Sequence, residues 1–178
     1  CVTIGVDPTA AILESNSKVD YKFNEYFSAE TSKDIKMNHP KIDLITFTNV
    51  FAHIEDLPVL LQNLNVLIDT DTTLVIENHY LGAILDRSQF DTFYHEHPRT
   101  YSLRSFEHIA QTLDLVITGV KFPSRYGGNI RVTMKKTGSP LDLTVYRSQE
   151  DSFVLKFSST VIPVRSNSIP TPTKPRLS

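Results

Sequence analysis

The sequence predicts an α/β domain with a mostly parallel sheet that is closed by an antiparallel hairpin. Short β-branched and apolar runs alternate with segments of helical periodicity, as in a parallel sheet with crossover helices. Near residues 123–128, a Pro-Ser-Arg-Tyr-Gly-Gly turn separates two strand-like runs, which favours a hairpin. The 178 residues are enough for one well-buried domain or for a fragment of a larger one.

The elements expected from the periodicity follow in order along the chain. Strands are expected over residues 2–6, 21–27, 41–50, 73–76, 115–122 and 129–135. Helices are expected over residues 10–13, 28–37, 55–68, 81–90 and 103–113, with Ser28 and Ser102 as N-caps. The periodicity then fades, and residues 141–157 fit either a strand or a helix. We therefore divide the chain into a core at 1–136 and an extended C-terminal segment of unknown role at 137–178.

The composition is that of an ordinary globular protein and excludes several classes of partner. A net charge of −2 gives no electrostatic case for nucleic acid or an anionic membrane surface. The one cysteine, Cys1, excludes an internal disulfide or a cysteine-based zinc site in this stretch and favours a cytoplasmic setting. No apolar run reaches the roughly 18 residues of a spanning helix. Because the chain opens within a strand-like run, we expect a further segment or domain upstream.

Polar side chains follow several predicted strands at the point where each one ends. Asp7 follows the first strand, Asn49 and His53 follow the strand at 41–50, and a Glu-Asn-His-Tyr run follows at 77–80. Ligands of open α/β sheets bind outside the carboxyl ends of the strands. Each residue alone is more often a cap or a loop residue, but together these positions predict a site at this edge.

The segment 89–98 is dense in groups that transfer protons, with Tyr94, His95, Glu96 and His97 in succession. In an extended backbone His95 and His97 would face one way, and Tyr94 and Glu96 the other. An imidazole beside a carboxylate suits a general base, whereas a polar loop with incidental histidines is the simpler interpretation. A metal site of Asp91, His95 and His97 is the weakest alternative, because a His-x-His pair alone is poor evidence.

Four motifs in a fixed order carry a resemblance to a known family. They are Ile-Gly-Val-Asp-Pro at 4–8, Asn-Val-Phe-Ala-His-Ile at 49–54, Phe-Asp-Thr-Phe-Tyr-His-Glu-His at 90–97 and Tyr-Gly-Gly-Asn-Ile-Arg at 126–131. From about Val2 to Met134 the chain resembles the S-adenosylmethionine-dependent C-methyltransferases that modify nucleotide-linked deoxysugars. The resemblance implies a Rossmann-like methyltransferase core with S-adenosylmethionine as cofactor. It also implies a small-molecule substrate such as a nucleotide-linked keto sugar.

In that family a base removes the proton beside a keto group, and the resulting enolate takes the methyl group. The resemblance implies that His97 is the base, while Glu96 and Tyr94 position it or handle the enolate oxygen. Such chemistry needs one well-placed imidazole and a hydrogen bond to the forming enolate. A non-catalytic Rossmann-like binding module, or a degenerate relative, is the alternative.

The resemblance also implies the groups that surround the reacting centre. Asn49 and His53 would border substrate and cofactor, and Asp7 would bind the ribose of the cofactor. His79 and Tyr126 would contact the substrate, at positions where relatives tend to have proline and histidine. Relatives also carry a zinc-binding domain and a glycine-rich cofactor loop upstream of the region that this chain matches, and a further domain after the hairpin.

Overall fold

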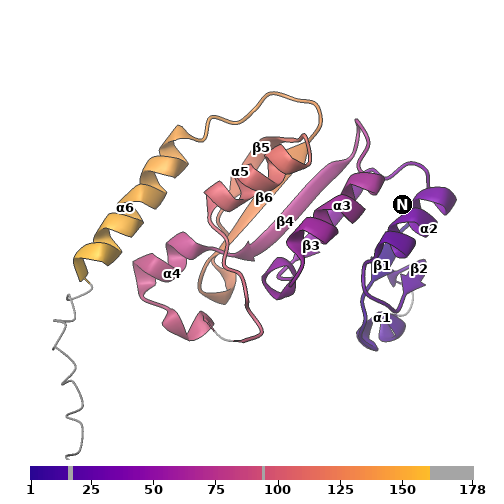
Figure 1. Ribbon diagram of the computed structural model, residues 1–178, viewed down its shortest axis with the longest axis horizontal. Coiled ribbons are helices and arrows are strands. Elements are labelled where there is room, and N and C mark those ends of the chain that lie inside the picture. Colours follow the sequence, from indigo (N-terminus) through magenta and orange to yellow (C-terminus); the bar gives the residue numbers. More distant parts are fainter. Residues whose placement is uncertain (16–17, 94, 161–178) are drawn as a thin grey trace, which may run out of the picture.

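The computed structural model describes residues 1–15, 18–93 and 95–160 (Figure 1). The strands are β1 (Ile4–Val6), β2 (Tyr21–Phe23), β3 (Leu44–Thr48), β4 (Thr73–His79), β5 (Val116–Lys121) and β6 (Asn129–Lys135). The helices are α1 (Ala11–Glu14), α2 (Ala29–Asn38), α3 (Leu57–Leu67), α4 (Leu81–Arg87), α5 (Leu103–Thr112) and α6 (Thr144–Thr160). Short 3-10 turns are η2 (Phe51–His53), η3 (Phe90–Thr92) and η4 (Arg125–Gly127).

The strands form two separate sheets, and the larger one is mixed. Strands β1 and β2 pair in parallel, and the other strands are ordered β3-β4-β6-β5. Only β3 and β4 pair in parallel in the larger sheet, because β6 lies between β4 and β5 and pairs antiparallel with both. Strands β3, β4 and β5 therefore point the same way, and β6 runs against them. The predicted α/β class and the hairpin of β5 and β6 are confirmed. The prediction of a mostly parallel sheet is confirmed only in part, because the larger sheet is mixed and both pairings of β6 are antiparallel.

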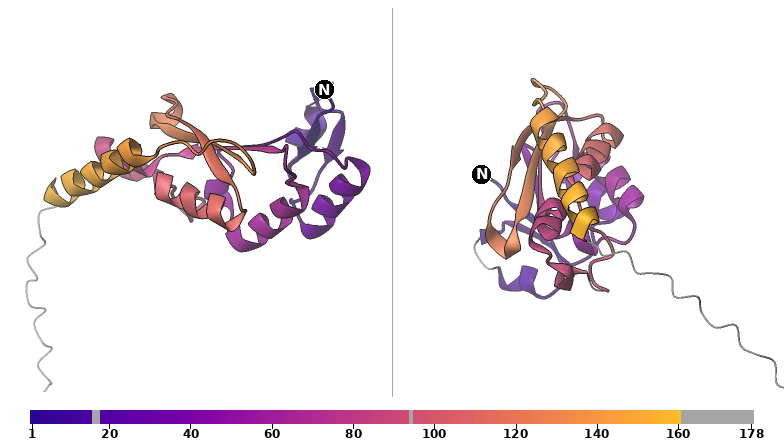
Figure 2. Two further views of the ribbon diagram at one scale, coloured as in Figure 1. Left: turned by 90° about the horizontal axis from the view of Figure 1, so that it is seen from above. Right: turned by 90° about the vertical axis from the view of Figure 1, so that its left-hand side faces the viewer.

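Helices α2, α3 and α5 lie on one side of the strands, as the view from above shows (Figure 2, left). Strand β6 reflects this one-sided cover, since Ile130, Val132 and Met134 are fully buried and the residues between them are partly exposed. Alternation of this kind places one face of a strand in the core and the other towards solvent. The hydrophobic core therefore lies between the larger sheet and helices α3 and α5.

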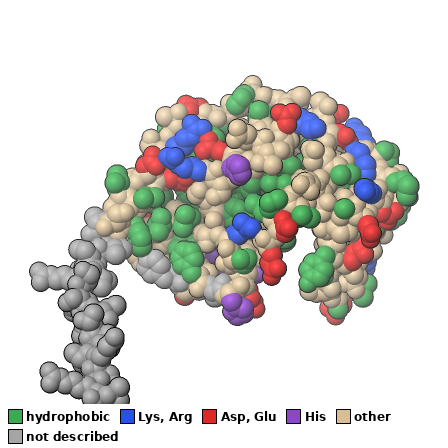
Figure 3. All heavy atoms as spheres, in the orientation of Figure 1, with side chains coloured by type: hydrophobic (Ala, Val, Ile, Leu, Met, Phe, Trp, Pro, Cys, Tyr) green, Lys and Arg blue, Asp and Glu red, His purple; other side chains and the backbone are tan. Residues whose placement is uncertain are grey.

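A notch separates the part that contains β1, β2 and α1 from the part that contains β3 (Figure 3). The notch opens where the smaller sheet ends and the larger sheet begins, and helix α2 packs against α3 beside it. The two sheets are thus held together through their helices and not through a strand pairing.

Local signals in the sequence account for most element boundaries. The side chain of Ser28 accepts a hydrogen bond from the Thr31 N–H at 3.1 Å, and Ser102 forms a capping box with Ser105, so both predicted N-caps are confirmed. Strand β2 is shorter than predicted, whereas β4 continues to His79. The polar residues 77–79 therefore belong to the strand itself and do not follow it.

The segment after residue 137 is not extended over its described part, because residues 144–160 form α6. The carboxylate of Glu150, which is 6% exposed, accepts a hydrogen bond from the Leu103 N–H at the start of α5. A carboxylate is favourable there because the first N–H groups of a helix lack partners within the helix. Arg104 and Asp151 add a salt bridge of 2.8 Å between the same helices. No helix of the described residues has the length and apolar character needed to cross a membrane.

Candidate functional site

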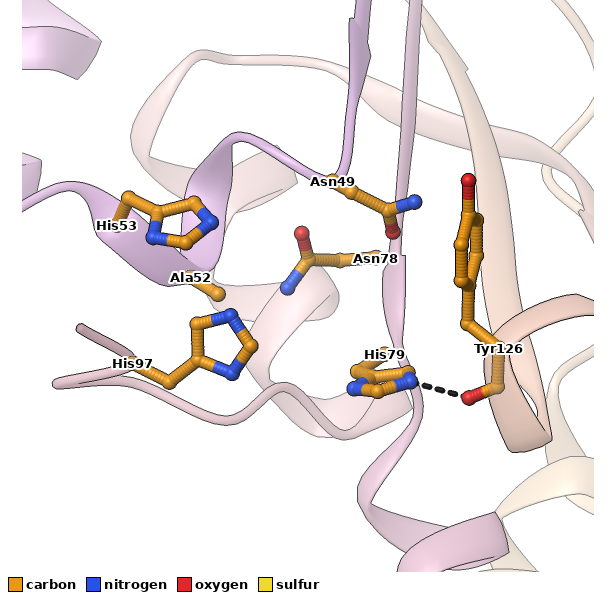
Figure 4. Close-up of a pocket in the computed structure, with 7 residues that line it drawn as sticks. All are labelled: Asn49, Ala52, His53, Asn78, His79, His97 and Tyr126. Atoms are coloured by element: carbon orange, nitrogen blue, oxygen red, sulfur yellow. Dashed lines mark hydrogen bonds between the residues drawn. The ribbon is translucent and has the colours of Figure 1, made fainter. Parts of the chain in front are cut away.

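A cavity of about 340 Å³ lies at the carboxyl ends of β3 and β4 (Figure 4). It is lined by Asn49, Ala52, His53, Asn78, His79, His97 and Tyr126. Five of these side chains are the ones singled out from the sequence, namely Asn49, His53, His79, His97 and Tyr126. The structure thus brings together residues that lie up to 77 positions apart in the chain, as expected for groups at one edge of a sheet.

Asn49 turns the chain sharply after β3 and begins the wall of the cavity. Its backbone is left-handed, with a φ of 55°, a conformation that asparagine tolerates better than most residues. The Asn49 N–H donates to the carbonyl of Glu77 at 2.8 Å, and the Asn49 Oδ1 accepts from the Asn129 Nδ2 at 3.1 Å. These bonds fix the turn that leads into η2, which carries His53.

His97 is held with its Nδ1 at 3.2 Å from the carbonyl oxygen of Thr92. Because a carbonyl oxygen only accepts, the proton lies on Nδ1 and the basic lone pair lies on Nε2. Burial is the largest cause and lowers the pKa of His97, while the hydrogen bond to the Thr92 carbonyl opposes it in part. The imidazoles of His53 and His79 lower this pKa a little further, and Glu96 raises it slightly. His97 is therefore neutral near pH 7, the state in which an imidazole can accept a proton.

The other two imidazoles are also oriented by backbone carbonyls. His53 Nδ1 donates to the Glu96 carbonyl at 2.8 Å, and His79 Nε2 donates to the Tyr126 carbonyl. The ring of His53 lies 4.7 Å from that of His97, and the ring of His79 lies 6.3 Å from it, measured between centroids. The loop that carries His97 is thus tied to η2, and the turn before β6 is tied to β4.

The segment around His97 differs in conformation from the prediction. His95 and Glu96 lie in a turn and not in an extended backbone, so the predicted alternation of side chains is wrong. Their side chains are 89% and 62% exposed, and Glu96 contributes its backbone carbonyl near the cavity. Tyr94 lies outside the described residues. Within residues 1–15, 18–93 and 95–160, no group of three His, Cys, Asp or Glu side chains is placed to hold a metal ion.

Glu77 is a central residue of this region, which the sequence analysis placed at the sheet edge without giving it a role. Its carboxylate is 2% exposed and lies 2.6 Å from the Nε atoms of Arg125 and Arg131 and 2.9 Å from the Asn129 Nδ2. Burial alone would raise the pKa of Glu77, but the hydrogen bonds from Asn129, Arg131 and Arg125 outweigh it and lower the pKa. Asn129 also bonds Asn49. Through Asn129, the ionised carboxylate of Glu77 is therefore linked to the turn at Asn49, which lines the cavity.

Asp7 ends β1 and does not line the cavity described above. Its Oδ1 accepts hydrogen bonds from the Thr9 side chain at 2.5 Å and the Thr9 N–H at 2.7 Å. These two bonds lower the pKa of Asp7, so its carboxylate is ionised at neutral pH. An ionised acceptor at a strand end has the chemistry that a ribose diol requires, and the role of Asp7 stays a prediction.

Comparisons with known proteins agree with the α/β architecture. A family model described as a methyltransferase domain matches residues 1–120. The C-methyltransferase NovU of Streptomyces niveus is 30% identical over 130 residues, which are 72% of this chain and 31% of that protein. The chain thus spans about a third of the length of that relative. A crystal structure of a SAM-dependent methyltransferase from Anabaena variabilis has the same fold, with a TM-score of 0.57 and 16% identity over 75% of this chain and 68% of that one.

Proposed function

Because the chain belongs to the family of S-adenosylmethionine-dependent methyltransferases, we propose that it forms part of a C-methyltransferase for keto sugars or similar carbon acids. The family membership implies S-adenosylmethionine as the cofactor. A nucleotide-linked deoxysugar is the substrate class that we favour, because the motifs at 49–54 and 90–97 resemble those of sugar C-methyltransferases. The low cysteine content supports a cytoplasmic setting for the reaction.

The observation that carries this proposal is the state of His97. Its Nδ1–H bond to Thr92 and its lowered pKa leave a neutral imidazole with a lone pair on Nε2, at the wall of a cavity. We assign this nitrogen as the base that removes a proton from the carbon beside a carbonyl group. Burial is the main reason that His97 is neutral, and the imidazoles of His53 and His79, which border the same cavity, lower its pKa a little further.

The remaining residues of the site hold and orient the reactants. Asp7 would bind the ribose hydroxyls of the cofactor, and Asn49 would lie between cofactor and substrate. His79 and Tyr126 form the wall opposite His97 and would contact the substrate (Figure 4). When bound, the cofactor supplies the methyl group that forms the new carbon–carbon bond. Glu96 and Tyr94 are proposed to orient His97 or the enolate oxygen.

Two measurements on the full chain test this function. Calorimetric titration with S-adenosylhomocysteine measures cofactor binding, and tight binding to these 178 residues would refute the alternative of a module without a cofactor. His97→Ala is expected to leave this binding unchanged and to abolish methyl transfer to a keto sugar nucleotide. His108→Ala is the matched control, because His108 is an exposed residue of α5. Full methyl transfer by His97→Ala would remove His97 as the base.

A further inference from the structure

Asn78 is a polar residue in the apolar row of β4. Leu74 and Ile76 are fully buried, and Asn78 continues their row because alternate residues of a strand face the same side. At Asn78 the core gives way to the cavity, and the side chain is one of those that line it. Asn78 is only 1% exposed, so its carboxamide has little contact with bulk solvent.

The carboxamide of Asn78 has no hydrogen-bond partner on either atom within the described part of the chain. Neither Oδ1 nor Nδ2 is paired, whereas the other buried amides without full pairing, Asn63 and Asn129, each lack a partner at a single atom. Leaving a buried polar group unpaired destabilises the fold, because the group loses its bonds to water and gains none in return. A group kept at that cost needs an explanation, and a ligand that supplies both bonds is the most direct one.

The surroundings of Asn78 restrict the chemistry of such a ligand. Figure 4 shows the carboxamide projecting from β4 into the cavity, towards the side on which His53 and His97 lie. The adjacent carboxylate of Glu77 belongs to the other face of β4, where Arg125 and Arg131 neutralise it. A neutral carboxamide offers one acceptor and two donor hydrogens. It therefore matches a neutral ligand that presents an acceptor next to a donor, and not a phosphate or a carboxylate.

We propose that Asn78 binds the carbonyl oxygen of the substrate and that the substrate is a hydroxyketone. The inference rests on the proposed function, in which His97 Nε2 takes the proton from the carbon beside this carbonyl. As that C–H bond breaks, its electron pair forms the carbon–carbon double bond of the enolate, and the carbonyl π pair moves to oxygen. The Asn78 Nδ2–H donates to this oxygen, and Asn78 Oδ1 accepts from the neighbouring hydroxyl group. Both polar atoms of the amide are then bonded, and the bond from Nδ2 strengthens as negative charge develops on the oxygen.

The first test compares stability with function in Asn78→Leu, which removes the polar atoms at similar volume. Because neither atom is bonded by any residue that the structure describes, this variant is expected to melt at the same or a higher temperature. Asn63→Leu is the matched control, since Asn63 is a buried residue of α3 with an unpaired Nδ2 and does not line the cavity. A clear loss of stability in Asn78→Leu alone would mean that Asn78 is structural and would overturn the inference.

The second test follows binding and proton removal with small probes. Hydroxyacetone contains a ketone beside a hydroxyl group, and 2-butanone is a ketone of similar size without one. The wild-type chain is expected to speed hydrogen–deuterium exchange at carbon in hydroxyacetone more than in 2-butanone. Asn78→Leu is expected to lose about 100-fold of the hydroxyacetone rate and most of this preference, since one donor to a developing oxyanion has an effect of this order. Asn63→Leu should keep both.

A titration with acetohydroxamate separates the two proposals. This planar molecule presents a donor and an acceptor like those of an enolate and its hydroxyl, and it should shift the Asn78 side-chain amide signals in nitrogen–proton spectra. His97→Ala should keep this shift and lose the exchange reaction. If His97→Ala retains exchange, the assigned base is wrong, although the shift would still support Asn78 as a ligand group. If the amide signals do not move, or if Asn78→Leu exchanges hydroxyacetone like the wild type, the inference about Asn78 is wrong.

Discussion

Replacing Glu77 with glutamine tests whether its carboxylate holds the site together. The variant keeps the shape but removes the charge that Arg125 and Arg131 share at 2.6 Å. Hydrogen bonds to charged groups contribute about 1.5–3 kcal/mol each, although these arginine side chains are 47% and 37% exposed and can regain water. We therefore expect a loss of about 2–3 kcal/mol in the free energy of unfolding, which is below the usual cost of breaking a fully buried pair. For a chain of this size that is about 4–12 °C in melting temperature.

The assay is thermal and urea unfolding as a function of pH, with Asp86→Asn as control. Asp86 pairs with Lys156 at 2.7 Å on the surface, so its loss should cost under about 1 kcal/mol. The fold lowers the pKa of Glu77, so its contribution is complete above the ordinary value of 4.5 and is lost as the pH falls through the lower value. The difference between wild type and Glu77→Gln should therefore shrink in acid. Equal effects of the two variants at pH 7, or a difference that grows in acid, would refute this account.

Two further predictions concern the base and the turn before β6. Because the pKa of His97 is lowered, kcat/KM should rise with pH through a midpoint below 6.5 and be flat at neutral pH. A midpoint above 6.5 in a pH–rate profile would contradict this. Gly128 has a φ of 126°, and a Cβ there would lie 2.6 Å from that of Ala83, so Gly128→Ala should lower the unfolding free energy by at least about 1–3 kcal/mol. Gly119→Ala, whose Cβ would meet only ordinary contacts at 3.6 Å, should show a much smaller change in the same unfolding assay.

The order of the elements was predictable because it depends on periodicity and on local caps. Ser28 and Ser102 are N-caps at which their helices begin, and each bonds a residue three positions further along the chain. Such short-range signals are visible in the sequence. Sheet order was not predictable in the same way. The sequence predicts residues 129–135 as a hairpin strand, but their pairing with β4 depends on contacts between residues at least fifty positions apart. This long-range pairing is what makes the larger sheet mixed.

The site was predictable in part, because strand ends converge in space. Asn49, His53, His79, His97 and Tyr126 were selected from the sequence and line one cavity. The sequence analysis missed that neighbouring side chains among residues 77–79 face opposite sides of the sheet, since it treated these residues as a group that follows a strand. Once these residues are placed within β4, the alternation of a strand puts Glu77 and His79 on one face and Asn78 on the other. The alternation of Leu74, Ile76 and Asn78 was the signal that could have identified Asn78.

The register of β4 consequently determines the chemistry of the cavity. Glu77 and Asn78 point to opposite faces, so a slip of one residue would place an ionised carboxylate near His53 and His97 and the neutral amide among the arginines. That carboxylate would raise the pKa of His97 and protonate the base at neutral pH. The fold prevents the slip through side chains as well as backbone, because Arg131 lies directly opposite Glu77 and bonds it across the strands. Asn129, opposite His79, bonds Glu77 as well, so the residues that stabilise the walls also fix which side chain enters the site.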